Sequence, residues 1–355
     1  MALDVAYEIE TKIVDDKEYD LACFVLLANN NINPNGKPFY SLDLLGKPTF
    51  EWVTRVCPTR PITLECENDD NPLQVIKPYL REREYTLVLF GDTPLLTRQN
   101  INNILDFVAS KGLNVCKLSR GYVFKTDYIK RVDEIFAPQT YYFNEEEFQV
   151  ASNLFEFAKI SRILQDRIVR FHQSRGVEFT NPKQVYIESD VAIGAGTKIE
   201  PNVYLSGETE IGANATICEG CKIVSSKIGN SSQILCAKIY NSVIKENCQI
   251  GDFVVIDGGS FIGAGSFVGA SCVIDASSLS QNVKIGANSN LKFARIYRDA
   301  KVGNSCCISG EQEQLARILH GATLGDFCLV SSGVAVKEQN VVPSGTILTL
   351  NSNEN

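Results

Sequence analysis

Asp92 is the first residue of the sequence whose type and position could support chemistry. It follows the apolar run "YTLVLF", which begins at Tyr85 and predicts a buried strand. In a domain with a parallel sheet, ligands bind at the carboxyl ends of the strands, and a carboxylate there can hold a Mg²⁺ ion that bridges nucleotide phosphates. The alternative is that Asp92 caps a helix that starts near Thr97. The residues alone leave both possibilities open.

His320 is a second candidate, because a histidine can accept a proton near neutral pH. The chain has only two histidines, His172 and His320. His320 could therefore be the general base of an acyl transfer. The surrounding "LARILHGA" also predicts a short helix that ends at Gly321, in whose last turn a histidine would only complement the helix dipole. We favour the helix interpretation.

The twelve cysteines do not carry a zinc signature. Only Cys218 and Cys221 form a C-x-x-C pair, and no matching histidines accompany them. Most of the other cysteines stand at positions that suit a small apolar side chain; examples are Cys248, Cys272, Cys306 and Cys328. We expect these cysteines to be reduced and buried, and the protein to be cytoplasmic.

The composition is that of a soluble globular protein. Of the 355 residues, 44% are hydrophobic and 21% are charged. No apolar run approaches the length of a membrane span, and no basic segment precedes an apolar one at the N-terminus, so we expect neither a transmembrane helix nor a signal peptide. The formal net charge is −8 and no Lys/Arg-rich block stands out, which argues against nucleic acid and membranes as partners.

The positions of these candidates depend on a repeat in the C-terminal half. From Ile187 onward, an aliphatic residue falls on every sixth position, with a few steps of five. The next residue is often Gly, and the residue four positions after the aliphatic is usually small. This pattern predicts a parallel β-helix of hexapeptide repeats, in which the aliphatic points inward and the Gly permits the turn. An α-helix is excluded because its period is different.

An insertion at 309–323, "SGEQEQLARILHGAT", interrupts the repeat. We expect it to project from the β-helix as a loop or a short helix, since such loops commonly build binding sites with neighbouring subunits. Val203 and Val254 are expected to be exposed on the outer faces, where they would favour association into a homotrimer.

The N-terminal half alternates predicted strands and helices, which favours a mostly parallel sheet with helices on both faces. A long helix over about 145–174 leads into the repeat. We therefore predict an α/β domain at 1–145, a linker helix at 146–178 and a β-helix at 179–350. The predicted strands are 20–28, 61–65, 85–92 and 113–118, and the predicted helices start near 46 and 97.

Several segments occur in one order along the chain: "LLGKPTFEWV", "GDTPLL", the long helix, "SRGVEFTNPKQVYIES" and the hexapeptide repeat. In this combination, the chain resembles the bifunctional N-acetylglucosamine-1-phosphate uridyltransferase/glucosamine-1-phosphate acetyltransferase family over nearly its whole length. The resemblance implies a shortened nucleotidyltransferase-like domain followed by a left-handed parallel β-helix, assembled as a homotrimer. It also implies Mg²⁺ and UTP at the first domain, acetyl-CoA as co-substrate at the second, and a sugar phosphate or sugar nucleotide as ligand.

The resemblance also assigns residues. The family's glycine-rich phosphate loop aligns with "LLANNNINPNGKP", which places Asn29 and Asn31 at its glycines and Lys37 near its lysine. Asp92 matches the metal aspartate of the family. Asn153, at the start of the long helix, matches the second metal ligand.

The acetyltransferase positions depart from the family. Its sugar-phosphate arginine aligns with Asp257 and its lysine aligns near Asp275, while the region of its general-base histidine contains no histidine here. Two aspartates in place of two cations would repel a sugar phosphate. We therefore predict that the protein does not acetylate glucosamine-1-phosphate.

Three functions remain open from the sequence. The first is an enzyme of the sugar-nucleotide pathway with altered sites, which the survival of Asp92 favours. The second is a catalytically silent scaffold or regulatory trimer, which the shortened nucleotide domain favours. The third is an acyl-CoA-dependent acyltransferase of different specificity that uses His320. The resemblance implies a nucleotidyltransferase or acyltransferase, but key catalytic residues of the family are missing.

Overall fold

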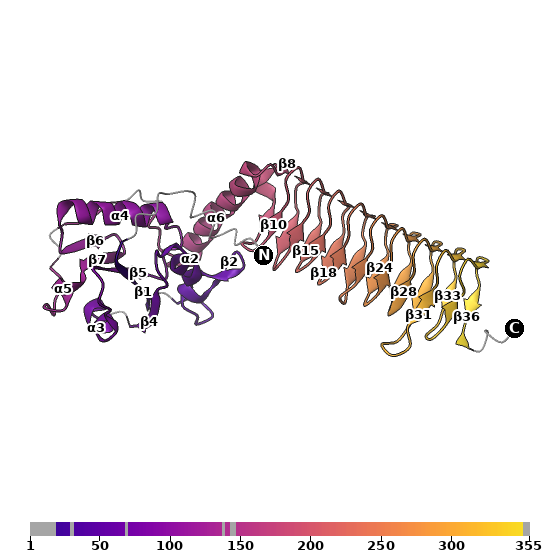
Figure 1. Cartoon of the computed structure of the whole chain (residues 1–355), viewed down its shortest axis with the longest axis horizontal. Helices are drawn as coiled ribbons and strands as arrows, with labels where there is room; N and C mark the ends of the chain where they lie inside the picture. Colours follow the sequence, from indigo (N-terminus) through magenta and orange to yellow (C-terminus); the bar gives the residue numbers. More distant parts are fainter. Residues whose placement is uncertain (1–18, 29–31, 68–69, 137–138, 143–146, 351–355) are drawn as a thin grey trace. The chain divides into compact units, whose positions relative to one another are not determined.

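The computed structural model describes residues 19–28, 32–67, 70–136, 139–142 and 147–350 (Figure 1). The chain divides between Ile168 and Val169 into two compact units. In the described part of the chain, no helix is long and apolar enough to cross a membrane.

Within its described residues, the N-terminal unit contains a five-stranded sheet of order β4-β1-β5-β7-β6. β1 pairs parallel with β4 and β5, whereas β7 runs antiparallel to both of its neighbours. Four strands thus run in one direction, which confirms the predicted mostly parallel sheet. The strands are β1 (Leu21–Ala28), β4 (Ile62–Cys66), β5 (Tyr85–Phe90), β6 (Val115–Leu118) and β7 (Gly121–Lys125). A separate hairpin joins β2 (Asp43–Leu44) and β3 (Lys47–Pro48).

Helices cover both faces of this sheet, because alternate residues of β1 pack into two different cores. Cys23 and Val25 share one core with residues of α2 and α4. Phe24 and Leu26 share the other core with residues of α3 and α5. The helices are α2 (Thr49–Val56), α3 (Pro72–Ile76), α4 (Arg98–Lys111) and α5 (Thr126–Ile129), with 3₁₀ turns η1 (Phe39–Ser41) and η2 (Lys77–Tyr79).

The predicted long helix is α6 (Leu154–Ser174), which begins about nine residues later than expected. Two of its residues, Ile160 and Leu164, are buried one turn apart, as the apolar spacing predicted.

Residues 178–348, all of which are described, form a parallel β-helix with three sheets, named faces 1 to 3 below. On each face, a strand pairs with the strand three later in sequence, so that every coil adds one strand to each face. Face 1 contains β10 (Ala192–Ile193), β13 (Glu210–Ile211), β16 (Lys227–Ile228), β19 (Val243–Ile244), β22 (Phe261–Ile262), β25 (Ser278–Leu279), β28 (Ala294–Ile296), β31 (Ala316–Ile318) and β34 (Ala335–Val336). Face 2 contains β8 (Glu178–Phe179), β11 (Lys198–Ile199), β14 (Thr216–Ile217), β17 (Gln233–Ile234), β20 (Gln249–Ile250), β23 (Phe267–Val268), β26 (Lys284–Ile285), β29 (Lys301–Val302), β32 (Thr323–Leu324) and β35 (Val341–Val342). Face 3 contains β9 (Tyr186–Ile187), β12 (Tyr204–Ser206), β15 (Lys222–Val224), β18 (Lys238–Tyr240), β21 (Val255–Asp257), β24 (Val273–Asp275), β27 (Asn290–Lys292), β30 (Cys307–Ser309), β33 (Leu329–Val330) and β36 (Ile347–Leu348). The 3₁₀ turn η3 (Pro182–Gln184) precedes β9.

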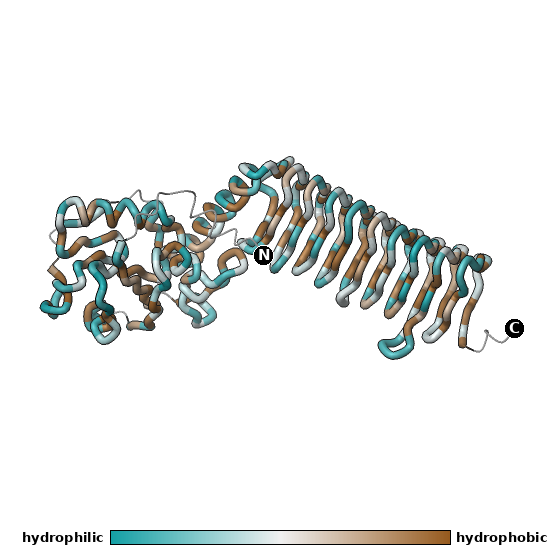
Figure 2. The backbone as a smooth tube through the Cα atoms, in the orientation of Figure 1, coloured by the Kyte–Doolittle hydropathy of each residue, from teal (hydrophilic) through white to brown (hydrophobic). Residues whose placement is uncertain are grey.

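The repeat produces this fold through two buried positions in each hexamer. The first is the repeating aliphatic: Leu205 pairs in register with Ile187 and Ile223, and all three are fully buried. Figure 2 shows the resulting hydrophobic segments recurring on successive coils. The second is the small residue two positions before the aliphatic. There, the Thr197 hydroxyl donates to Gly212 O (2.6 Å) in the next coil and accepts from that coil's backbone.

This second position explains one wrong prediction. Val203 and Val254 were expected on the outer faces, but they are buried, with exposed fractions of 1% and 0%. Each stands two residues before an inward aliphatic, where its side chain adds to the core. The cysteines Cys248, Cys272, Cys306 and Cys328 occupy the same position and are buried as predicted. All twelve cysteines of the chain lie in described residues and are free thiols.

The insertion agrees with its prediction only in part, because residues 310–315 form a loop whereas the residues that follow belong to the β-helix. Residues 316–318 form β31, whose Ile318 is fully buried and whose residues pair in register with β28. Residues 310–315 connect β30 to β31 without forming a helix. The helix interpretation of "LARILHGA" is therefore wrong, because its apolar residues continue the β-helix column.

Candidate functional site

Asp92 lies just beyond the end of β5, and Arg120 neutralises its carboxylate. The Arg120 Nε and Nη2 atoms donate to Asp92 Oδ1 (3.1 Å) and Oδ2 (2.7 Å), and the Asp92 side chain is 8% exposed. The guanidinium also lies over the Phe90 ring, 4.3 Å from its centroid. Asp92 does not cap α4, because Thr97 and Asn100 form a capping box there. The capping alternative for Asp92 is therefore wrong.

The surroundings of this ion pair are acidic. Burial first, and then the carboxylates of Asp70, Glu67 and Asp92, raise the pKa of the nearby Cys66 thiol to about 11, while Arg120 opposes them. Three carboxylates and one guanidinium therefore lie near the Cys66 thiol at this edge of the sheet, so that negative charges outnumber positive ones among these groups.

Two other residues assigned to metal and nucleotide, Asn153 and Lys37, are described, and neither is hydrogen-bonded to the Asp92 carboxylate. Asn153 is exposed, and its Oδ1 accepts from Glu156 N (3.0 Å), which caps the start of α6. Lys37 is exposed in a turn closed by Asn33. Asn29 and Asn31 lie outside the described residues. Among the residues described, no group of three or more His, Cys, Asp or Glu side chains could hold a metal ion.

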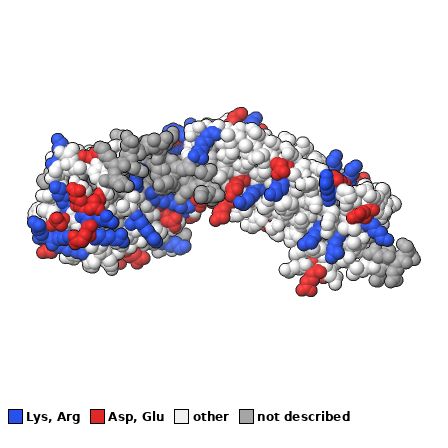
Figure 3. All heavy atoms as spheres, viewed as in Figure 1, with Lys and Arg blue, Asp and Glu red and all other residues white. Residues whose placement is uncertain are grey.

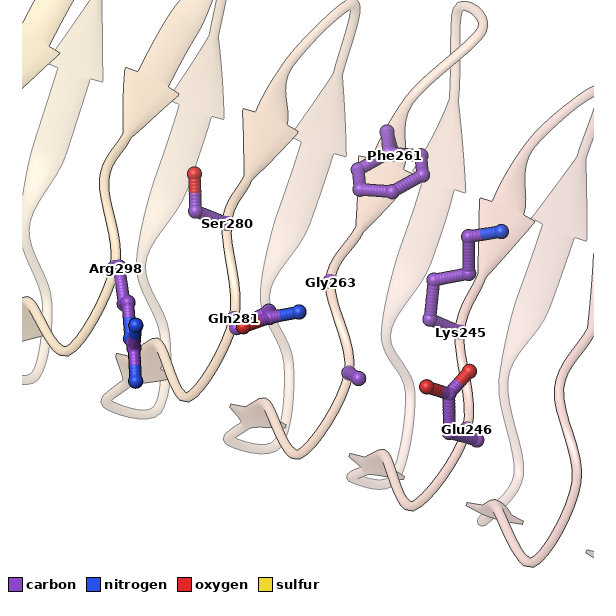
Figure 4. Close-up of a pocket in the computed structure, with 8 residues that line it drawn as sticks. Lys245, Glu246, Phe261, Gly263, Ser280, Gln281 and Arg298 are labelled. Atoms are coloured by element: carbon purple, nitrogen blue, oxygen red, sulfur yellow. The ribbon is translucent and has the colours of Figure 1, made fainter.

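A pocket of about 420 Å³ lies on the β-helix, beside the carboxyl ends of four successive face 1 strands (Figure 4). We call it the coil groove. Its lining residues are Lys245, Glu246, Phe261, Gly263, Ala264, Ser280, Gln281 and Arg298. Backbone hydrogen bonds hold the turns in one stack: Glu246 O, Ala264 O and Gln281 O each accept from an N–H of the next coil at 2.9–3.1 Å.

The coil groove combines two cations, Lys245 and Arg298, with one carboxylate, Glu246, an aromatic ring and neutral hydrogen-bonding groups. Lys245 Nζ lies 5.8 Å from the centre of the Phe261 ring. Arg298 pairs with Asp299 at 3.3 Å, but both side chains are largely exposed, so water screens this pair and the guanidinium can still attract an anion. Ser280 and Gln281 supply a hydroxyl and an amide. Such a set suits a polar ligand that carries both a ring and a phosphate.

His320 lies one coil beyond Arg298 in the same stack. Its Nδ1 is 2.9 Å from Arg298 O, which also accepts from Gly321 N at 3.0 Å. A carbonyl can only accept, so Nδ1 carries the hydrogen, and Nε2 is the unprotonated nitrogen of the neutral ring. The His320 side chain is 46% exposed. This arrangement leaves a solvent-accessible proton acceptor next to the coil groove.

The two aspartates that the resemblance aligns with cations of the family, Asp257 and Asp275, lie on face 3. Asp257 and Asp275 pair in register on neighbouring coils, and Asp275 pairs with Lys292 on the next coil. Lys292 Nζ lies 3.9 Å from Asp275 Oδ2, and the Asp257 carboxylate accepts from Gly258 N (2.6 Å). The column therefore carries two negative charges and one positive charge.

The coil groove was not predicted from the sequence. Glu246, Ala264, Gln281 and Arg298 recur at intervals of 17 or 18 residues, which is the length of one coil. Aligning the sequence coil by coil would have placed them in one column, followed by His320 after the insertion.

The fold and the repeat define the class of protein. The family described as "GLGC left-handed parallel beta-helix domain" matches residues 213–347, and "Bacterial transferase hexapeptide (six repeats)" matches residues 190–225. The C-terminal unit is thus a left-handed parallel β-helix of hexapeptide repeats, as predicted.

Sequence relatives identify the chain more narrowly. It is 29% identical over 237 residues to "Bifunctional protein GlmU" of Thermodesulfovibrio yellowstonii, an overlap that covers 65% of this chain and 52% of that protein. It is 30% identical over 214 residues to the protein of the same name from Clostridium beijerinckii, an overlap that covers 58% of this chain and 46% of that protein. It is 24% identical over 334 residues to the protein of the same name from Streptococcus thermophilus (strain CNRZ 1066), an overlap that covers 75% of this chain and 73% of that protein. These matches confirm the resemblance of the chain to GlmU proteins. The chain spans about half the length of the first two relatives.

Solved structures overlap with the chain only in part. UDP-N-acetylglucosamine O-acyltransferase (LpxA) from Moraxella catarrhalis has a TM-score of 0.35 and 15% identity, covering 43% of this chain and 65% of that one. The UDP-N-acetylglucosamine acyltransferase from Campylobacter jejuni has a TM-score of 0.28 and 21% identity, covering 47% and 69%.

Proposed function

We propose that the protein is a transferase of the sugar-nucleotide pathway that binds a sugar phosphate or sugar nucleotide in the coil groove. The observation that carries the proposal is the grouping of Lys245, Phe261, Gln281 and Arg298 in one groove of the β-helix, with His320 on the next coil. The relationship to GlmU proteins supports the pathway, and the chemistry of the groove supports the kind of ligand.

Each of these side chains would bind a different part of such a ligand. Lys245 and Arg298 would bind phosphate oxygens through charge-assisted hydrogen bonds. The Phe261 ring offers an apolar surface for a sugar or base. Ser280 and Gln281 would bind hydroxyl groups. Because the groove spans four coils, a ligand with separate ring and phosphate parts fits it better than a single small anion.

The transfer step we propose uses acetyl-CoA or another acyl-CoA as donor and His320 as general base. His320 Nε2 would take the proton from the attacking amine or hydroxyl of the sugar as the acyl–oxygen or acyl–nitrogen bond forms. The thioester bond breaks, and the proton passes to the departing thiolate, which leaves as free CoA. Arg298 O holds the imidazole in the required tautomer through Nδ1.

The acceptor we propose is not glucosamine-1-phosphate. The resemblance aligns Asp257 with one cation of the family for that substrate and places a second near Asp275, and the two aspartates lie in register on face 3. Two carboxylates there would repel its phosphate.

A thiol-release assay with acetyl-CoA and a panel of sugar phosphates and UDP-sugars tests the proposal. We expect turnover with at least one acceptor, and we expect His320→Ala to lower kcat by about 10²–10⁴-fold. The Lys245→Ala and Arg298→Ala variants should instead raise KM for the acceptor. Absence of turnover across the panel, or turnover unchanged in His320→Ala, would contradict the catalytic part of the proposal.

A second candidate function is a catalytically silent scaffold or regulatory trimer. The observation that favours it is the Asp92–Arg120 pair, since the resemblance assigns Asp92 as the metal aspartate and its carboxylate is engaged by another side chain. Ligand binding in the coil groove without turnover would support this alternative.

A further inference from the structure

We propose that the strand-end site of the N-terminal unit does not take up Mg²⁺ or a nucleoside triphosphate, because Arg120 occupies the place of the metal as the partner of Asp92. The ion pair is then a structural element of the unit. This inference is independent of the function proposed for the β-helix.

The backbone explains how Arg120 reaches Asp92. Arg120 lies between β6 and β7, and the next residue, Gly121, opens β7 opposite Leu89 of β5. Gly121 has φ of +136°, and a Cβ on it would lie 2.4 Å from Val88 O. Only glycine fits this close approach of β7 to β5. The turn therefore brings the Arg120 side chain over the end of β5, where Phe90 and Asp92 hold it.

The residues present do not fit a magnesium site. Both carboxylate oxygens of Asp92 accept hydrogen bonds from Arg120. Mg²⁺ requires several oxygen ligands in near-octahedral geometry, and a guanidinium at hydrogen-bond distance would repel it. The other candidate ligand, Asn153, uses its Oδ1 to cap α6.

The same edge does not suit a triphosphate either. The carboxylates of Glu67, Asp70 and Asp92 all act on the Cys66 thiol, and Arg120 is the cation that opposes them there. A ligand with several negative charges would meet this excess of acid.

The ion pair instead connects three parts of the unit. Its carboxylate binds the β6–β7 turn through Arg120, and Asp92 itself follows β5. The Asp92 carbonyl accepts from Ala151 N (2.8 Å), in the segment that leads to α6. Loss of one partner would leave the other charged and largely buried, which is strongly destabilising.

Metal binding by the full-length protein is the first test. We expect no saturable binding of Mn²⁺, followed by electron paramagnetic resonance, up to millimolar concentration, and no thermal shift with Mg²⁺ and UTP. Saturable Mn²⁺ binding that Asp92→Asn abolishes would overturn the proposal, whereas the expected absence of binding needs only the unmutated protein.

A double-mutant cycle is the second test. We expect Arg120→Gln and Asp92→Asn each to lower Tm by about 5 °C or more, and the double variant to lose less than the sum, because it leaves no unpaired charge. Arg83→Gln is the matched control, since the Arg83–Asp20 pair is half exposed and its loss should change Tm by about 1 °C or less. Additive losses at Arg120 and Asp92 would overturn the structural role.

Discussion

His172 and His320 are the only histidines of the chain, and they differ in exposure and in hydrogen bonding. His320 is exposed, with a tautomer set by Arg298 O. His172 is 1% exposed, and neither of its ring nitrogens has a hydrogen-bond partner among the described residues. Burial first, and the charge of Arg175 second, lower the pKa of His172 to about 4. His172 is therefore a neutral core residue at physiological pH.

This burial makes stability depend on pH. The pKa of His172 is about 4 in the folded chain and about 6.5 when unfolded, so between these values the unfolded chain binds a proton that the folded chain does not. Stability should be full above pH 6.5 and should fall by about 2 kcal/mol on going to pH 5. Urea denaturation from pH 5 to 7.5 measures this. His172→Phe should remove most of the slope, and an unchanged slope in that variant would contradict the assignment.

At the residue scale, the sequence could identify candidates but could not identify their partners. Asp92 was predicted at the end of a strand and lies there. Arg120 was not predicted as its partner, because the two residues are 28 positions apart and meet only through the pairing of β5 with β7. The coil groove escaped prediction for the same reason, since each of its coils contributes only one or two side chains.

At the scale of elements, local patterns determined most of the N-terminal strands and helices. β1 is buried over all eight residues, as its continuous apolar run predicted. The start of α6 was wrong because apolar spacing does not mark where a helix begins, whereas the cap at Asn153 does. The helix predicted over residues 316–318 was wrong because a short apolar run fits a helix or a buried strand equally well. The predicted exposure of Val203 and Val254 was wrong because each hexapeptide buries two positions and not one.

The capping box of α4 allows a prediction for a single element. Thr97 Oγ1 accepts from Asn100 N, and Asn100 Oδ1 accepts from Thr97 N. Thr97→Ala should lower the free energy of unfolding of the N-terminal unit by about 1 kcal/mol. Chemical denaturation followed by circular dichroism measures the loss. Ser110→Ala, at an exposed site on the same helix, should change it by less than about 0.5 kcal/mol, and an equal loss in both variants would contradict the capping role.

The coil turns allow a second prediction at this scale. A Cβ on Gly286 would lie 2.5 Å from the Gly303 carbonyl carbon of the next coil, so Gly286→Ala forces neighbouring coils apart. We expect a loss of about 3 kcal/mol or more. Gly259 has open space around its Cα but φ of +73°, so Gly259→Ala should cost only about 1–2 kcal/mol of backbone strain. Thermal denaturation of both variants tests this order, and a larger loss for Gly259→Ala would contradict it.

At the scale of the whole molecule, the resemblance to a trimeric family predicts a homotrimer. A trimer would have a mass of about 118 kDa, which is three times 39.2 kDa. The buried Val203 and Val254 no longer support this expectation, but exposed apolar side chains elsewhere on the β-helix do, such as Phe267 and Val273. Light scattering at micromolar concentration measures the mass, and a value near 39 kDa would contradict the trimer.

The charge distribution bears on which part of the molecule binds an anion. On the face shown in Figure 3, acidic and basic side chains are interspersed over the N-terminal unit. The protein as a whole is acidic, with a net charge of −8. A negatively charged ligand therefore depends on local cations. The coil groove supplies Lys245 and Arg298 beside one carboxylate, Glu246, whereas Arg120 at the strand end is paired with Asp92.

Isothermal titration with UDP-N-acetylglucosamine tests the central claim, that the coil groove is the ligand site, most directly. We predict one saturable site per chain, whose Kd rises at least about tenfold in the Lys245→Ala/Arg298→Ala double variant. Lys301→Ala, an exposed lysine on face 2, and Asp92→Asn should leave the Kd unchanged. Binding that survives the double variant, or that Asp92→Asn abolishes, would contradict the account.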